Sequence, residues 1–207
     1  MTERRPRDRL LQAAREVLAD EGLEGLTLRA IARRAGVSHG APLRHFPTLA
    51  SLLAALATEG FERLVATIEL DLAAADKAAA DAGAPPPTAR HRLGVAGRAY
   101  LRFALADPGV FSVTFRPERV DISDPDYQAA GFRSFQQLVD LVEAAQADGW
   151  QPSVPTRDLA AVLWANVHGL ATLALHGGLG AVAGPEPLER LGALSSVLAL
   201  GYEGDPR

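Results

Sequence analysis

Residues 26–46, LTLRAIARRAGVSHGAPLRHF, constrain this chain more than any other segment, because they contain two short helical patterns joined by a glycine turn. Leu28 and Ile31 begin an apolar face at helical spacing, and Thr27 is placed to cap the start of that helix. Gly36 is expected to end the helix in the left-handed conformation, which glycine adopts at little cost. The segment is therefore predicted to be a helix, a tight turn and a second helix.

The second helix is predicted to be very short, starting at Ser38, a good N-cap, and ending at Arg44. In a helix-turn-helix, the second helix places its N-terminal residues against base edges in the major groove of DNA. The alternative interpretation is an ordinary pair of short helices inside a helical core. The DNA-binding interpretation predicts contacts from Thr27, Arg29, Arg33, Ser38, His39, Gly40, Ala41, Arg44 and His45.

The surrounding pattern favours a compact three-helix head at the N-terminus. Residues 9–21 form an amphipathic helix pattern that Gly22 stops. After the second short helix, Pro47 interrupts the pattern and Thr48 is expected to cap a long helix that reaches about residue 75. We therefore predict a DNA-binding domain over residues 1–50 and a larger helical domain over residues 51–207.

The distribution of charge supports this division. The whole chain has a formal net charge of −4, which does not suggest a nucleic-acid partner. Residues 1–50, however, contain nine Arg and six acidic residues, whereas the remainder contains 12 basic and 19 acidic residues. A basic head on an acidic body is the pattern expected of a local DNA footprint, although chance asymmetry in a soluble helical protein is an alternative.

The body is predicted to be all-helical, which gives an all-α protein of about nine helices. Residues 81–88 and 116–124 are loops by composition, Asp124-Pro125 is a helix start, and Thr156 is expected to cap a long uncharged helix. In the helix over residues 125–148, the apolar positions expected to face inward are Phe132, Phe135, Leu138, Val139 and Val142. The other body helices are expected over residues 89–106, from Asp107-Pro108, over 156–177 and over 187–202.

The last two predicted helices are too apolar for the surface of a monomer. Residues 159–185 contain no charged side chain, but the helical part ends at Gly177 and includes Asn166 and His168, so it is short for a membrane span. We expect a helix buried by protein on all sides, and no membrane partner. Two such helices from each of two subunits would form a four-helix homodimer interface with twofold symmetry.

A second candidate site lies on the long uncharged helix. Trp164, His168 and Thr172 recur at i, i+4 and i+8 and therefore share one helix face. They are predicted to line a mostly apolar small-molecule site. The alternatives are a Trp–His pair packed in the core and plain core packing for each phenylalanine. The candidate walls of the site are Tyr100, Phe103, Phe111, Phe115, Phe132 and Phe135.

The sequence gives little support for other classes of function. The chain has no cysteine, which excludes disulfides and thiolate metal sites. His168 and His176 share a helix face but lie about 12 Å apart along the axis, too far for one metal ion. Ser195 and Ser196 lack the setting of a catalytic nucleophile. We therefore predict no metal, no cofactor and no enzyme, in a protein of the cytoplasm, since the charged N-terminus lacks a signal-peptide core.

Two motifs resemble those of a known family. Residues 10–56 resemble the N-terminal domain of TetR-type transcriptional repressors, through the run LTLRAIARRAGVS and the His-Phe pair that follows it. The run from Trp164 to Gly169, WANVHG, resembles the W-x-x-x-H-G run of a subgroup defined by its C-terminal domain. The resemblance implies a homodimeric repressor that binds a palindromic operator and is released by a small molecule.

Two departures from the family pattern suggest an alternative function. Members usually carry Tyr where Leu43 stands and Lys where Leu49 stands, and both of those residues supply contacts to phosphate. Their loss would weaken DNA binding, unless the basic arm formed by Arg4, Arg5, Arg7 and Arg9 compensates. The alternative is a TetR-like ligand-binding or interaction module with weakened DNA binding.

Overall fold

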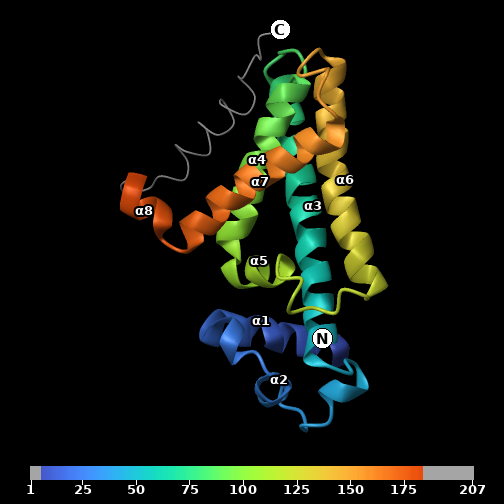
Figure 1. The fold of residues 1–207 in the computed structure, drawn as a ribbon, viewed down its shortest axis with the longest axis vertical. Helices are drawn as coiled ribbons and strands as arrows, with labels where there is room; N and C mark the ends of the chain where they lie inside the picture. Colours follow the sequence, from blue (N-terminus) through green and yellow to red (C-terminus); the bar gives the residue numbers. More distant parts are fainter. Residues whose placement is uncertain (1–5, 184–207) are drawn as a thin grey trace. The chain divides into compact units, whose positions relative to one another are not determined.

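The computed structural model describes residues 6–183, which form eight α-helices, one 3-10 helix and no strand (Figure 1). This confirms the predicted all-α class, while the predicted last helix over residues 187–202 lies outside the described residues. In chain order the elements are α1 (Pro6–Gly25), α2 (Leu28–Arg34), η1 (Pro42–Arg44), α3 (Leu49–Asp81), α4 (Ala89–Ala106), α5 (Pro108–Thr114), α6 (Pro125–Ala147), α7 (Thr156–Leu175) and α8 (Gly178–Ala183).

The helices belong to two compact units whose boundary differs from the predicted one at residue 50. The first unit combines Met1–Glu62 with Asp107–Phe132, and the second combines Arg63–Ala106 with Arg133–Arg207. Both α3 and α6 therefore contribute residues to each unit. The functional division into residues 1–50 and 51–207 stays a prediction.

Several helices begin where the sequence predicts, because a side chain accepts an otherwise unpaired backbone N–H of the first turn. Thr27 Oγ1 accepts from the N–H of Ala30 at 3.1 Å, which fixes the start of α2. Thr48 Oγ1 likewise accepts from the N–H of Ser51 at 3.0 Å at the start of α3. Thr156, by contrast, is the first residue of α7 and not its cap, and its hydroxyl donates to Gln146 Oε1 at 2.7 Å.

The second helix of the predicted helix-turn-helix is shorter than expected. Gly36 has the predicted left-handed backbone, with φ of 67°, but residues 39–41 form a turn and only Pro42–Arg44 form a 3-10 helix. The reason is Pro42, which has no N–H to donate to the carbonyl of Ser38 as an α-helix requires. The N–H of Ala41 donates to that carbonyl at 2.9 Å, which gives the tighter i to i+3 pattern. We call residues 38–45 the reader turn.

The reader turn is held by the apolar core of the first unit. This core joins buried side chains of α1, α2 and α3 to Val110 and Val113 of α5. Leu11, Ile31, Leu52 and Leu56 are fully buried in it. α5 lies so close to α1 that a side chain at Gly109 would meet Leu18 Cγ at 2.7 Å. The core of the first unit therefore includes residues far outside 1–50.

The prediction that Phe132 points inward on α6 is wrong. Its side chain is 61 % exposed, whereas Val139 and Val142 of the same helix are buried as expected. Small residues bring this part of α6 close to α3: Ala130 is buried, and a Cβ at Gly131 would lie 3.4 Å from the Phe61 ring. The helix therefore packs through Ala130 and Gly131 here, and Phe132 remains exposed.

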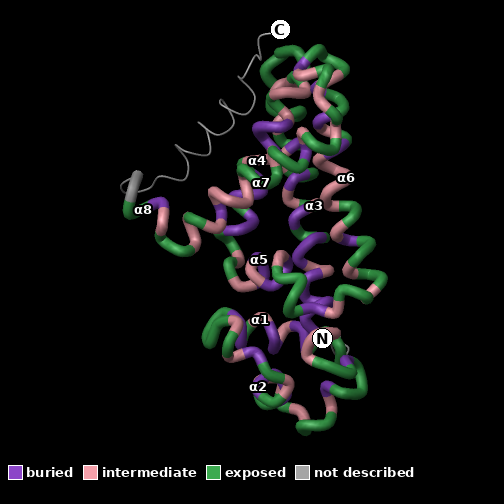
Figure 2. Tube along the Cα trace, in the orientation of Figure 1, coloured by how far each residue is buried: buried purple, intermediate pink, exposed green. Residues whose placement is uncertain are grey.

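α7 is the one helix of residues 6–183 that is long and apolar enough to cross a membrane by length and composition. A core helix of a soluble protein meets the same test, but only 11 % of the apolar window of α7 is buried within the described chain. Figure 2 accordingly shows α7 mostly in the colours of intermediate and exposed residues. The described residues of one chain therefore do not cover this helix, and the expected burial on all sides would require further protein.

We expect Gly60→Ala to destabilise the protein, because α3 and α5 approach each other at this glycine. A methyl group there would overlap the Thr114 hydroxyl and lie 3.1 Å from Val110 Cγ1. Overpacking of this kind costs about 1–3 kcal/mol of unfolding free energy. Gly97→Ala on α4 is the matched control, since nothing lies within 4 Å of the added methyl. It should instead stabilise by about 0.5–1 kcal/mol. Equal midpoints of urea unfolding for the two variants would contradict this account.

Candidate DNA-reading segment and candidate effector site

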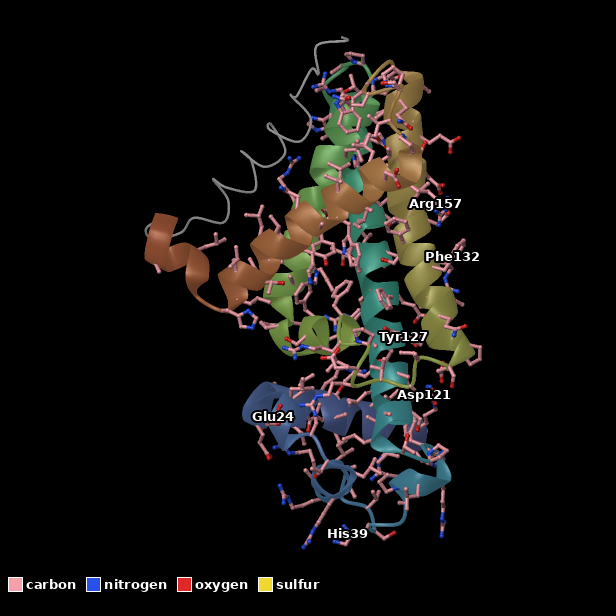
Figure 3. All side chains as sticks on the ribbon, in the orientation of Figure 1. Glu24, His39, Asp121, Tyr127, Phe132 and Arg157 are labelled. Atoms are coloured by element: carbon pink, nitrogen blue, oxygen red, sulfur yellow. The ribbon has the colours of Figure 1, made fainter. Side chains whose placement is uncertain are left out.

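The first unit exposes nearly all the residues predicted to contact DNA. Of the predicted contacts in the reader turn, Ala41 is half-buried, and the exposed ones are Ser38, His39, Gly40, Arg44 and His45. Thr27, Arg29 and Arg33 of the preceding helix and its cap are also exposed. Figure 3 shows His39 at the surface of this unit. The predicted face is thus available to a partner.

Arginines of the first unit divide into structural ones and exposed ones. Arg34 Nη1 is hydrogen-bonded to Asp20 Oδ2 at 2.8 Å, which ties α2 to α1. Arg9 Nη2 donates to the carbonyl of Ala35 at 3.1 Å, so this residue of the predicted basic arm braces the end of α2. Arg33 lies 3.7 Å from Glu21, but its side chain remains 70 % exposed. Arg9 and Arg34 therefore act on the position of the reader turn.

The two residues that replace the family's phosphate contacts have different surroundings. Leu49 is partly buried and packs against the core of the first unit, so it has taken a structural role. Leu43 is 53 % exposed in η1, so it has not. The two departures from the family pattern therefore differ: Leu49 contributes to packing, and Leu43 remains at the surface.

The second unit brings four of the predicted effector residues into one chain of contacts. The Phe135 ring of α6 lies 6.3 Å from the Trp164 ring of α7, which lies 5.8 Å from the His168 ring. His168 Nδ1 is hydrogen-bonded at 2.8 Å to the hydroxyl of Tyr100 on α4. The predicted spacing of Trp164 and His168 thus places both on the same face.

The electrostatics of this cluster favour neutral side chains. Burial raises the pKa of the Tyr100 phenol well above its ordinary value, and a hydrogen bond from Trp164 partly opposes this. Burial also lowers the pKa of His168, so its imidazole is neutral near pH 7. A protonated phenol can donate to Nδ1 of a neutral imidazole, which places the ring proton on Nε2. The cluster thus offers uncharged hydrogen-bonding groups among aromatic rings.

The remaining predicted wall residues lie in other surroundings. Phe111 and Phe115 belong to the first unit, where their rings lie 5.1 Å apart and Phe115 meets Phe61 edge-on at 5.4 Å. Phe103 is buried in the second unit with the Arg63 guanidinium 5.9 Å from its ring. Thr172 is half-buried on α7. The role of these four residues as effector ligands, and that of Phe132, which is exposed in the first unit, therefore stays a prediction.

Two features of the cluster were missed in the sequence. The Arg157 guanidinium lies 5.7 Å from the Phe135 ring, and Arg157 precedes Trp164 by seven residues, so helical spacing could have placed it on the same face. Trp150 is buried beside this part of the second unit, in a cluster with Leu93 and Ala160, and its indole N–H has no hydrogen-bond partner in the structure. No sequence pattern indicates that second feature, because Trp150 lies in a loop.

Across residues 6–183, no group of three or more His, Asp or Glu is placed to hold a metal ion.

Comparison with known proteins identifies the class to which this fold and these sites belong. Residues 10–56 match the sequence profile of bacterial regulatory proteins of the tetR family, and residues 93–193 match that of the tetracyclin repressor-like C-terminal domain. The two profiles cover the reader turn and the Trp164–His168 face. The comparison with curated proteins found no match.

Solved structures agree over nearly the whole chain. A protein of unknown function from Rhodococcus sp. RHA1 is 32 % identical, with a TM-score of 0.80 over 97 % of this chain and 96 % of that one. The fatty acid degradation regulator FadR from Bacillus halodurans is 16 % identical, with a TM-score of 0.72 over 99 % and 100 % of the two chains. A tetR-family regulatory protein from Rhodococcus RHA1 is 23 % identical, with a TM-score of 0.67 over the same shares.

The fold and the exposed helix-turn-helix define a helical DNA-binding regulator. The chain belongs to the TetR family and is a transcription regulator of that family. Proteins of this family bind operator DNA, respond to small molecules and dimerise, and the family is regulatory and not enzymatic.

Proposed function

We propose that this protein is a cytoplasmic repressor that binds a palindromic operator as a homodimer and leaves it when a small molecule binds. The observation that carries the proposal is the exposed reader turn. The helix before it, α2, is held in place by the hydrogen bonds of Arg9 to the Ala35 carbonyl and of Arg34 to Asp20. Within the reader turn, His39 and Arg44 are exposed and carry groups that can contact bases or phosphates. Two such segments in a dimer would meet half-sites about one helical turn apart.

The exposed apolar face of α7 supports the homodimer. Val162 is 65 % exposed and Leu173 is 51 % exposed, and the face between them carries no charged side chain. Apolar surface of this kind is stabilised when a second subunit removes it from water. We assign α7 to the dimer interface together with the predicted helix over residues 187–202.

The aromatic cluster supports the effector site. Phe135, Trp164, His168 and Tyr100 combine apolar rings with a few hydrogen-bonding groups, which is the composition of small-molecule sites in general. An effector acts only to the extent that it binds two states of the dimer differently. A change from 1:99 to 99:1 in their ratio requires about 5.5 kcal/mol of differential binding.

A second candidate function follows from Leu43 and Leu49. With neither residue able to anchor a phosphate, the chain would keep its effector site and bind DNA weakly, as an interaction module. The partial burial of Leu49 in the core favours this alternative at that position. A gel-shift titration decides between the two functions, because only a repressor binds one operator far more tightly than unrelated DNA.

We expect the reader turn and α2 to bind operator DNA through Arg29 and His39. Removing a base contact should cost about 1–3 kcal/mol and relax sequence preference, whereas removing a phosphate contact should weaken binding to all sequences alike. The measurement is a gel-shift titration of Arg29→Ala and His39→Ala at constant salt, on the DNA that flanks the coding region. Arg98→Ala, an exposed arginine of α4, is the control and should bind as the unmodified protein does. Unchanged affinity in both test variants would reject this DNA face.

We expect Val162→Glu to separate the subunits. The substitution would place an unpaired charge in the proposed interface, where its burial is strongly unfavourable. Sedimentation at a concentration where the unmodified protein is dimeric should then show folded monomer. Leu70→Glu, at an exposed leucine of α3, is the control and should stay dimeric. A dimer of unchanged stability in Val162→Glu would place the interface elsewhere.

We expect Trp164→Phe and His168→Gln to reduce the response to an effector while operator binding stays near normal. The first change removes an indole N–H and the second an imidazole, but both keep the approximate size of the side chain. The measurement is release of labelled operator by a compound first identified with the unmodified protein. Ile122→Ala, at an exposed residue that belongs to neither proposed site, provides a control that should release normally. Full release in both test variants would move the site away from this face.

A further inference from the structure

Leu43 is the one large apolar side chain that is exposed among residues 6–62 of the structure. The other large apolar residues of this stretch, from Leu10 in α1 to Phe61 in α3, are buried or half-buried. Single exposed leucines are ordinary on protein surfaces, but this one lies within the reader turn. Its exposure at this position therefore bears on DNA contact, because the reader turn is the segment proposed to enter the major groove.

The backbone holds Leu43 in this exposed position from both sides. Pro42 before it is fully buried, and Phe46 after it is 3 % exposed. The carbonyl of Pro42 accepts from the N–H of His45 at 2.9 Å and from that of Phe46 at 2.8 Å. The turn around Leu43 is therefore closed by hydrogen bonds and anchored by buried rings. The leucine side chain projects from a fixed turn.

The surroundings of Leu43 identify the kind of partner. Arg44, His45 and His39 are all exposed near it in sequence, so the surface combines one apolar group with polar and cationic ones. An apolar protein partner would need a contiguous apolar patch, and a single leucine does not provide one. Leucine has no donor for a phosphate. The apolar group that DNA presents beside hydrogen-bonding base edges is the 5-methyl group of thymine in the major groove.

We propose that Leu43 is a specificity-determining residue that contacts the 5-methyl group of a thymine in each half-site of the operator. The inference rests on the proposed function, because it requires the reader turn to enter the major groove. In this account, Leu43 replaces a phosphate anchor with an apolar base contact. Part of the affinity for operator DNA should then depend on the thymine methyl group and not on the charge of the DNA backbone.

The test compares thymine with deoxyuridine, which lacks only that methyl group. A duplex is first selected from a random library with the full-length protein, and each thymine is then replaced by deoxyuridine in turn. Gel-shift titrations at constant salt give the dissociation constants. At one symmetry-related pair of positions, the unmodified protein should bind the deoxyuridine duplex about three- to fivefold more weakly for each half-site replaced, on the scale of one buried methyl group.

Variants at residue 43 assign the effect to this side chain. Leu43→Ala should bind the thymine and deoxyuridine duplexes equally, whereas Leu43→Met, which keeps an apolar side chain of similar size, should retain most of the preference. Leu70→Ala, a second exposed leucine on α3, should discriminate as the unmodified protein does. This comparison is a double-mutant cycle between one side chain and one methyl group. Circular dichroism checks that each variant is folded.

Each outcome bears on the inference separately from the proposed function. Selection of a duplex that is bound tightly but shows no deoxyuridine effect at any position would overturn the role of Leu43 and leave the repressor intact. So would an effect that persists in Leu43→Ala, or equal weakening of both duplexes by that substitution, which would indicate contact with the sugar–phosphate backbone. A protein that binds no duplex in preference to others would overturn the proposed function, and the inference with it.

Discussion

Burial of one apolar core in the first unit fixes the position of the reader turn. Ile31 of α2 is fully buried among Leu11 of α1 and Leu52 and Leu56 of α3, and each such side chain contributes about 1.5–3 kcal/mol relative to exposure. α2 is only seven residues long, too short to be stable by itself in water. Its existence therefore depends on this core. The position of the exposed residues that follow Gly36 is therefore set by the packing of α1, α2 and α3.

Pro42 shows how a local conflict with helix formation becomes part of the site. A proline at this position prevents a regular α-helix from Ser38 to Arg44, so the turn tightens into 3-10 geometry. The same ring is fully buried and anchors the turn to the core. Pro42 thus removes one helical hydrogen bond but fixes the backbone around Leu43. Such a departure from local preference is expected at functional sites more than elsewhere.

Sequence patterns predicted the helices of this chain better than their packing, for a physical reason. Caps and breakers act within a few residues, so Thr27, Gly36 and the bounds of α4 could be predicted from short segments. The inclusion of α5 in the core of the first unit could not, because it depends on Gly109 approaching Leu18 from about ninety positions away in the sequence. The error at Phe132 has the same origin, since periodicity favours large apolar side chains as contacts. In the structure, Ala130 and Gly131 make the contact. In the aromatic cluster, spacing on α7 paired Trp164 with His168, and Tyr100 was one of six aromatic candidates. Only the three-dimensional structure identifies Tyr100 as the hydrogen-bond partner of His168.

The two proposed roles of α7 lie on opposite sides of one helix. At about 100° per residue, Trp164 and His168 occupy one side, and Val162 and Leu173 occupy the other. The first side is tied to α4 by the Tyr100–His168 hydrogen bond, and the second is exposed in the single chain. A ligand that inserts between Tyr100 and His168 would have to replace a hydrogen bond between half-buried and buried groups, or leave them unpaired at a cost of about 1–3 kcal/mol. Any shift of α7 that accommodates such a ligand moves the opposite side as well, because a helix is rigid over so short a length. In the proposed dimer, the effector would therefore be sensed at the subunit interface through α7 itself.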